Sequence, residues 1–176
     1  MAVILRPAQP DDVTAVGHLH YRSRCSAYRD IVPESALTAV PADAMAGWWV
    51  ERWSYERDTH LLTVAEADGA LAGFTYVGPD EDGDPAAGEL YAIHVDDQYH
   101  GRGIGTALIH DALATMRRRR YLRGTLWVIT ANQRARRFYE RGGWQPDGGR
   151  RDGWIGPVST PQLRYAQALT ERSDNI

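Results

Sequence analysis

A glycine-rich connection between a strand and a helix constrains this chain more than any other feature of its sequence. Residues 95–106 read Val-Asp-Asp-Gln-Tyr-His-Gly-Arg-Gly-Ile-Gly-Thr, with glycines at alternate positions from Gly101 to Gly105. Residues 89–95 before it favour a strand, and apolar residues recur every four positions along 104–116, as in a helix facing a core. Such a loop exposes several backbone N–H groups at the positive end of a helix, so it predicts a phosphate or pyrophosphate site.

A dinucleotide-binding loop is the obvious alternative, and the spacing of the glycines argues against it. That fingerprint reads GxGxxG, and counting from Gly101 or Gly103 places its third glycine on Thr106 or Leu108. The sequence also contains no lysine, so all 20 of its Lys and Arg residues are Arg. Schiff-base enzymes and lysine-dependent phosphate loops are therefore excluded.

Composition limits the cellular location and the binding partners that we expect for this chain. The formal net charge of -3 gives no overall attraction to nucleic acid or to an anionic membrane. Cys25 is the only cysteine, which excludes an intrachain disulfide and a cysteine-rich metal cluster. No apolar run reaches the roughly 18 residues of a spanning helix, and acids follow the N-terminus too soon for a signal peptide. We expect a cytoplasmic protein with no metal, no nucleic-acid partner and no membrane partner.

The rest of the pattern predicts an alternation of strands and helices. Asp68-Gly69 separates two apolar runs and favours a two-residue hairpin turn. Residues 78–88 are rich in acids, Gly and Pro, so we expect a solvated loop there. We expect strands at 3–6, 60–67, 70–78, 89–95, 124–129 and 163–168, and helices at 10–28, after Pro33, after Pro41, from 104 to near 117–120 and at 133–141.

The strand predicted at 89–95 has two faces with different residues. Alternation along a strand sends successive side chains to opposite faces of the sheet. It predicts Glu89, Tyr91, Ile93 and Val95 on one face, with Leu90, Ala92 and His94 on the other.

Two motifs in the second half of the chain carry a family resemblance. Residues Val95 to Gly105 approximate V-x-P-x-(Y)-(R/Q)-G-x-G-(I/L)-G, with Asp97 and His100 as departures. The second motif approximates N-x-x-A-x-x-(F)-Y-x-x-x-G-(F) and is made by Asn132, Ala135, Phe138, Tyr139, Gly143 and Trp144. Together the motifs resemble the GNAT superfamily of acyl-CoA-dependent N-acetyltransferases, over residues 3–169. Residues 170–176 are predicted to be a flexible tail.

The resemblance implies a fold and a co-substrate. The fold is a single α/β (α+β) domain with a mixed, mostly antiparallel sheet of six to seven strands, helices on both faces, and a splayed central parallel pair at 89–95 and 124–129. Acetyl-CoA would lie between those two strands, with its pyrophosphate on main-chain N–H groups of the glycine loop. Arg134, Arg136 and Arg137 are candidates for the adenosine phosphate. The implied coenzyme-binding residues are Ile93, His94, Val95, His100, Gly101, Arg102, Gly103, Ile104, Gly105, Thr106, Asn132 and Tyr139.

The chemistry of acetyl transfer to an amine needs a base and an acid. The amine must lose a proton to attack the thioester, and the departing thiolate must gain one. The resemblance assigns these roles to Glu89 and Tyr139, with a main-chain N–H near Ile93 for the thioester oxygen. A water relay in place of a dedicated base stays open. Glu89, Tyr91 and Tyr28 are expected to bind the acceptor.

We therefore expect an N-acetyltransferase that acts on a primary amine of a small molecule by direct attack in a ternary complex. A protein or peptide acceptor, at an N-terminus or a lysine, is the alternative enzyme, and a non-catalytic CoA sensor is the alternative from another class. Trp49 and Trp53 favour core or dimer contacts over acceptor stacking, so a homodimer stays open. Residues 117–120, four arginines, favour charge at a helix C-terminus over RNA binding.

Overall fold

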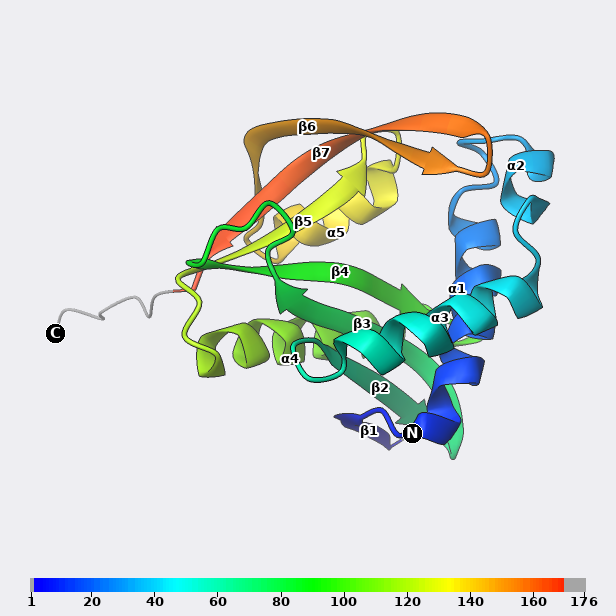
Figure 1. Cartoon of the computed structure of the whole chain (residues 1–176), viewed down its shortest axis with the longest axis horizontal. Coiled ribbons are helices and arrows are strands. Elements are labelled where there is room, and N and C mark those ends of the chain that lie inside the picture. Colours follow the sequence, from blue (N-terminus) through cyan, green and yellow to red (C-terminus); the bar gives the residue numbers. More distant parts are fainter. Residues whose placement is uncertain (1, 170–176) are drawn as a thin grey trace, which may run out of the picture.

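The computed structural model describes residues 2–169 and forms one seven-stranded sheet with helices on both faces (Figure 1). The strand order is β1-β2-β3-β4-β5-β7-β6. The predicted tail at 170–176 lies outside the described residues. The strands are β1 (Val3–Pro7), β2 (Leu61–Ala67), β3 (Ala70–Pro79), β4 (Ala87–Val95), β5 (Arg123–Ile129), β6 (Gln145–Ile155) and β7 (Val158–Ala168). The helices are η1 (Pro10–Asp12), α1 (Val13–Ala27), α2 (Glu34–Thr38), α3 (Ala42–Glu56), η2 (Asp97–Tyr99), α4 (Ile104–Arg118) and α5 (Gln133–Arg141).

Two groups of helices bury the two faces of the sheet. Helices α1 and α3 cover one face, where Leu19 and Trp49 pack with Phe74 and Tyr76 of β3. Helices α4 and α5 cover the other face, where the largest buried side chain is that of Trp144. In Figure 1, α3 lies in front of the sheet and α4 passes behind it. The predicted architecture is confirmed, including the assignment of Trp49 to the core.

The central parallel pair separates soon after it begins. Strands β4 and β5 pair only over three positions, from Ala87 with Arg123 to Glu89 with Thr125. Beyond that point β5 pairs with β7 and β4 pairs with β3, and Figure 1 shows β4 and β5 diverging. The predicted splay is confirmed, and it leaves the facing edges of the two strands without a strand partner among residues 2–169.

The hairpin predicted at Asp68-Gly69 is present. Both residues have positive φ, 53° and 80°, and the flanking strands β2 and β3 are antiparallel neighbours. Positive φ at both central positions is the geometry that matches the twist of a two-residue hairpin.

Strands β4, β6 and β7 differ most from the sequence prediction. Strand β6 is absent from the predicted strands, because its residues include Pro146, three glycines and many charges, which have low β propensity. It forms through pairing with β7, with an irregular register between Pro146 and Arg150, and Gly156 turns the hairpin with a φ of 53°. Strand β4 begins at Ala87 rather than Glu89, and β7 begins at Val158 rather than Leu163.

The predicted alternation along β4 is wrong because a bulge interrupts it. Ala92 pairs with Tyr76 and Leu90 pairs with Val77, so Tyr91 is an extra residue on β4. An extra residue reverses the facing of the side chains on one side of the bulge.

The reversal separates Glu89 from Ile93 and Val95, with which the alternation groups it, and leaves it on the side of Tyr91. Leu90 packs in the cluster under α4, on the same side as Ile93 and Val95. Glu89, next to Leu90, therefore faces the side that carries α1 and α3, as does Ala92.

None of the helices in residues 2–169 combines the length and the hydropathy that crossing a bilayer requires.

Candidate active site

Glu89 lies at the last paired position before the strands separate, opposite Thr125 of β5. Its side chain is only 2% exposed. Its Oε2 atom accepts a hydrogen bond of 2.9 Å from the backbone N–H of Glu81. The carboxyl group therefore sits at the apex of the splay, held by a main-chain donor.

The surroundings of Glu89 favour its neutral form. Burial raises its pKa to about 7, the N–H of Glu81 and the cation of Arg151 oppose that rise, and the carboxylates of Glu81 and Asp80 add to it. A carboxyl group with a pKa near neutrality can accept and release protons at working pH, which suits a general base.

Tyr91 lies on the same side as Glu89. Its hydroxyl donates a hydrogen bond to the carbonyl oxygen of Pro79, and its ring lies 5.1 Å from the guanidinium of Arg52. Burial, followed by the charge of Glu89, raises the pKa of Tyr91. Of the three residues expected to bind the acceptor, Glu89 and Tyr91 are thus brought together.

Tyr139 lies on α5, on the opposite face of the sheet from α1 and α3. Its side chain is 8% exposed and packs with Trp144 and Tyr165. Burial, followed by the charge of the Tyr28 phenol, raises the pKa of Tyr139. Tyr28 follows α1, so its interaction with Tyr139 joins helices of both faces. Within residues 2–169 the Tyr139 hydroxyl has no hydrogen-bond partner, and burial keeps it protonated.

The glycine loop has the predicted shape. Gly101 and Gly103 have φ values of 75° and 81°, and Gly103 caps α4, which begins at Ile104 as expected. A Cβ at Gly101 or Gly103 would meet no atom within 4 Å. The loop therefore presents its backbone at a helix N-terminus with open space beside it.

His100 connects this loop to α5. Its Nε2 lies 3.0 Å from the carbonyl oxygen of Val95, and its Nδ1 lies 3.1 Å from a guanidinium nitrogen of Arg134. Since arginine can only donate, Nδ1 accepts and Nε2 donates. Arg134 thus reaches the loop, whereas Arg136 is bound to Tyr165 and to the carbonyl of Thr130, and Arg137 is exposed.

Two of the other predicted coenzyme residues, Asn132 and His94, use their side chains in contacts within the protein. Asn132 uses its side-chain oxygen to cap α5, accepting from the N–H of Ala135 at 3.1 Å. The side chain of His94 faces away from α4 and lies 3.0 Å from the hydroxyl of Ser23, so only its backbone is placed for a ligand between the strands. Burial lowers the pKa of His94 to about 4.

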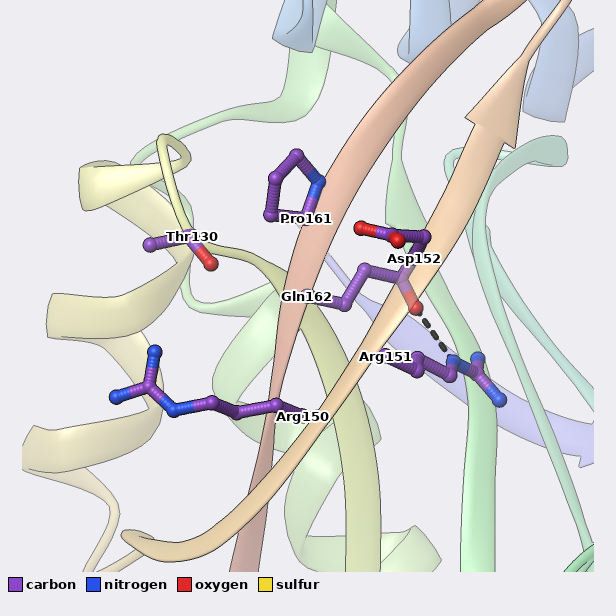
Figure 2. A pocket seen from close by; sticks show the side chains of 6 residues that line it. All are labelled: Thr130, Arg150, Arg151, Asp152, Pro161 and Gln162. Carbon is purple, nitrogen blue, oxygen red and sulfur yellow. Dashed lines mark hydrogen bonds between the residues drawn. The ribbon is translucent and has the colours of Figure 1, made fainter.

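Two cavities lie beside this site, at the end of β5. One, of about 450 Å³, is bounded by Val32, Ile129 and Thr160, and the other, of about 320 Å³, lies between Thr130 and β6. Figure 2 shows Arg150 and Arg151 pointing to opposite sides of β6 at the second cavity. Arg136, a candidate for the adenosine phosphate, lines the first cavity, whereas Glu89 and Tyr139 line neither.

Four residues around Glu89 were missed by the sequence analysis: Asp80, Glu81, Thr125 and Arg151. Asp80 is 7% exposed and accepts from the hydroxyl of Thr125 at 3.0 Å. The acidity of residues 78–88 is the signal in the sequence for this group, but acids beside Gly and Pro equally indicate a solvated loop. No group of three or more His, Cys, Asp or Glu side chains suited to a metal ion occurs in the described range 2–169.

Comparison with known proteins gives one matching family. Residues 22–144 match the model of the acetyltransferase (GNAT) family. An uncharacterised N-acetyltransferase of Methanocaldococcus jannaschii is 34% identical over 55% of this chain and 44% of its own length. A mycothiol acetyltransferase of Propionibacterium freudenreichii is 32% identical over 76% of this chain and 39% of its own. The chain therefore spans less than half the length of these two relatives.

The fold has solved counterparts. The PaiA N-acetyltransferase of Thermoplasma acidophilum, crystallised with coenzyme A, superposes with a TM-score of 0.76 at 19% identity, covering 96% of this chain and 99% of its own.

Proposed function

Since this chain belongs to the acetyltransferase (GNAT) family, we propose that it transfers the acetyl group of acetyl-CoA to a primary amine of a small molecule. The observation that carries the proposal is the splay of β4 and β5, with Glu89 at its apex. The name of the mycothiol acetyltransferase relative favours a small acceptor over a protein.

The residues present fit a coenzyme. Main-chain N–H groups between His100 and Thr106 would hold the diphosphate, because they lie at the N-terminus of α4 with open space at Gly101 and Gly103. The unpaired edge of β4 beyond Glu89 would pair with the pantetheine arm as an added strand does. Arg134 adds guanidinium donors beside the loop, and His100 positions it by accepting one of its hydrogen bonds.

Replacing Gly103 by alanine is expected to weaken acetyl-CoA binding about tenfold, since a left-handed residue with a Cβ costs about 1–2 kcal/mol and shifts the loop amides. Gly69 is a matched control, because its φ of 80° and its open surroundings are like those of Gly103. Gly69→Ala should lose similar stability yet bind acetyl-CoA normally. Calorimetric titration measures the acetyl-CoA affinity of both variants. If Gly103→Ala and Gly69→Ala bind acetyl-CoA equally well, the loop is not part of the coenzyme site.

Acetyl-CoA, when bound, supplies a thioester carbonyl that an amine can attack with release of the thiol. The carboxylate of Glu89 takes a proton from the amine, directly or through a water molecule. The hydroxyl of Tyr139 donates a proton toward the thiolate. A main-chain N–H of β4 near Ile93 donates to the carbonyl oxygen, and Tyr91 and Tyr28 contact the acceptor.

Thiol release from acetyl-CoA across a panel of amines tests the proposal. Release with small primary amines and not with peptides is expected. Release only with peptides would favour a protein acceptor, and tight binding without release from any acceptor would favour a CoA sensor. We further propose a cytoplasmic location, and pairing of two chains stays a prediction.

A further inference from the structure

The acidic connection between β3 and β4 forms ion pairs with arginines of β5, β6 and β7. Each of three ion pairs joins one acid of residues 80–86 to a different arginine. Glu81 pairs with Arg151 of β6, Asp82 with Arg164 of β7 at 3.1 Å, and Asp84 with Arg123 of β5 at 2.7 Å. The connection is therefore closed over the apex of the splay rather than free in solvent.

One of these pairs lies next to the proposed base. Glu81 uses its carboxylate to bind Arg151 and its backbone N–H to bind the carboxylate of Glu89. The other two pairs hold residues farther along the connection, and neither Asp82 nor Asp84 contacts Glu89.

Arg151 is itself fixed on three sides. Its Nε donates to Oε1 of Gln162 at 2.7 Å, drawn in Figure 2, and its guanidinium lies 4.3 Å from the centre of the Trp127 ring. Its terminal nitrogen Nη1 donates a hydrogen bond to the carboxylate of Glu81. A planar guanidinium with these contacts has little conformational freedom, so it restrains the Glu81 carboxylate that it binds.

We propose that Arg151 is a positioning residue for the acetyl transfer: by anchoring Glu81 it aims the Glu81 backbone N–H at Glu89 and holds the Glu89 carboxylate toward the acceptor amine. This inference rests on the proposed function, in which Glu89 is the base. It adds a residue from β6, a strand that contributes none of the residues assigned above.

The charged and titratable groups that face Glu89 set the sign of the expected effect. They are Asp80 and Glu81 of the connection, Tyr91 of β4 and Arg151 of β6. The guanidinium and the Glu81 N–H both favour the ionised carboxylate. Loss of Arg151 removes the cation and releases the N–H, so the base should become protonated at a higher pH.

Arg151→Gln is expected to lower kcat/KM about tenfold at its optimum and to move the acidic limb of the pH profile up by about one unit. Arg151→Lys, which keeps the charge, should return the acidic limb most of the way to its wild-type pH. Arg164→Gln is the matched control, because Arg164 anchors the same connection and lies near the same ring, 5.7 Å from its centre. It should leave the limb in place.

The variant Glu89→Gln separates this inference from the proposed function. If the acidic limb survives in Glu89→Gln, Glu89 is not the base and the proposed function fails at that step. If the limb is lost, Arg151→Gln added to Glu89→Gln should lower the rate no further. A tenfold loss that persists in the double variant, or an equal limb shift in Arg164→Gln, would overturn the role of Arg151.

Discussion

Glu89→Gln is expected to lower kcat/KM for the amine by about 10²- to 10³-fold, within the range of general-base catalysis. Glutamine keeps the shape of the side chain and can still accept the N–H of Glu81, but it cannot take a proton. The pKa of about 7 predicts that the wild-type rate falls as the pH drops below 7, because the base is then protonated. The pH–rate profile of the variant should lack that limb.

Stability measurements distinguish lost chemistry from lost structure. Burial raises the Glu89 pKa above its unfolded value, so the native state holds the proton more tightly and stability falls as the pH rises from about 4.5 to about 7. Glu89→Gln should therefore be more stable than wild type at pH 8, by about 1–3 kcal/mol, with little difference at pH 5. Urea unfolding at the two pH values measures this.

A control and a contradicting result complete the test. Glu66 pairs with Arg6 between β1 and β2, far along the sheet from β5, so Glu66→Gln should leave the limb unchanged. An acidic limb that remains in Glu89→Gln would assign proton removal to a water relay or another group.

Local sequence chemistry explains which parts of the fold could be predicted. Positive φ at Gly69 and Gly103 is a property of single residues, and the four-residue spacing along α4 reflects contacts with one face. The hairpin, the glycine loop and the start of α4 were therefore visible in the sequence. Asn132 could be placed before α5 and Tyr139 on it, because Asn is a preferred N-cap and Gly142-Gly143 ends the helix.

Features made by distant contacts could not be predicted. The bulge at Tyr91 exists only through pairing with β3, and it reverses the face of Glu89 without any local signal. Strand β6 is polar and forms because β7 pairs with it. The pair between Glu81 and Arg151 joins residues 70 positions apart, so the acidic connection looked solvated when only its own residues were considered.

Tyr139→Phe is expected to lower kcat about 100-fold while leaving acetyl-CoA affinity nearly unchanged, because only the proton donor is removed. The Tyr139 hydroxyl has no hydrogen-bond partner in residues 2–169, so its loss should not reduce stability. Tyr165→Phe is a matched control with the opposite profile. The Tyr165 hydroxyl donates to Glu140 at 2.7 Å and accepts from Arg136 at 3.0 Å, so its loss should cost about 1–2 kcal/mol and leave kcat unchanged.

Comparing these two phenylalanine variants shows whether the Tyr139 hydroxyl is kept for chemistry. Both tyrosines are buried, and their rings lie 6.3 Å apart, so the two changes perturb one cluster in similar ways. Stopped-flow thiol release gives kcat, and thermal unfolding gives stability. Equal kcat in Tyr139→Phe and wild type would mean that the thiolate leaves without this proton, and Tyr139 would be a packing residue only.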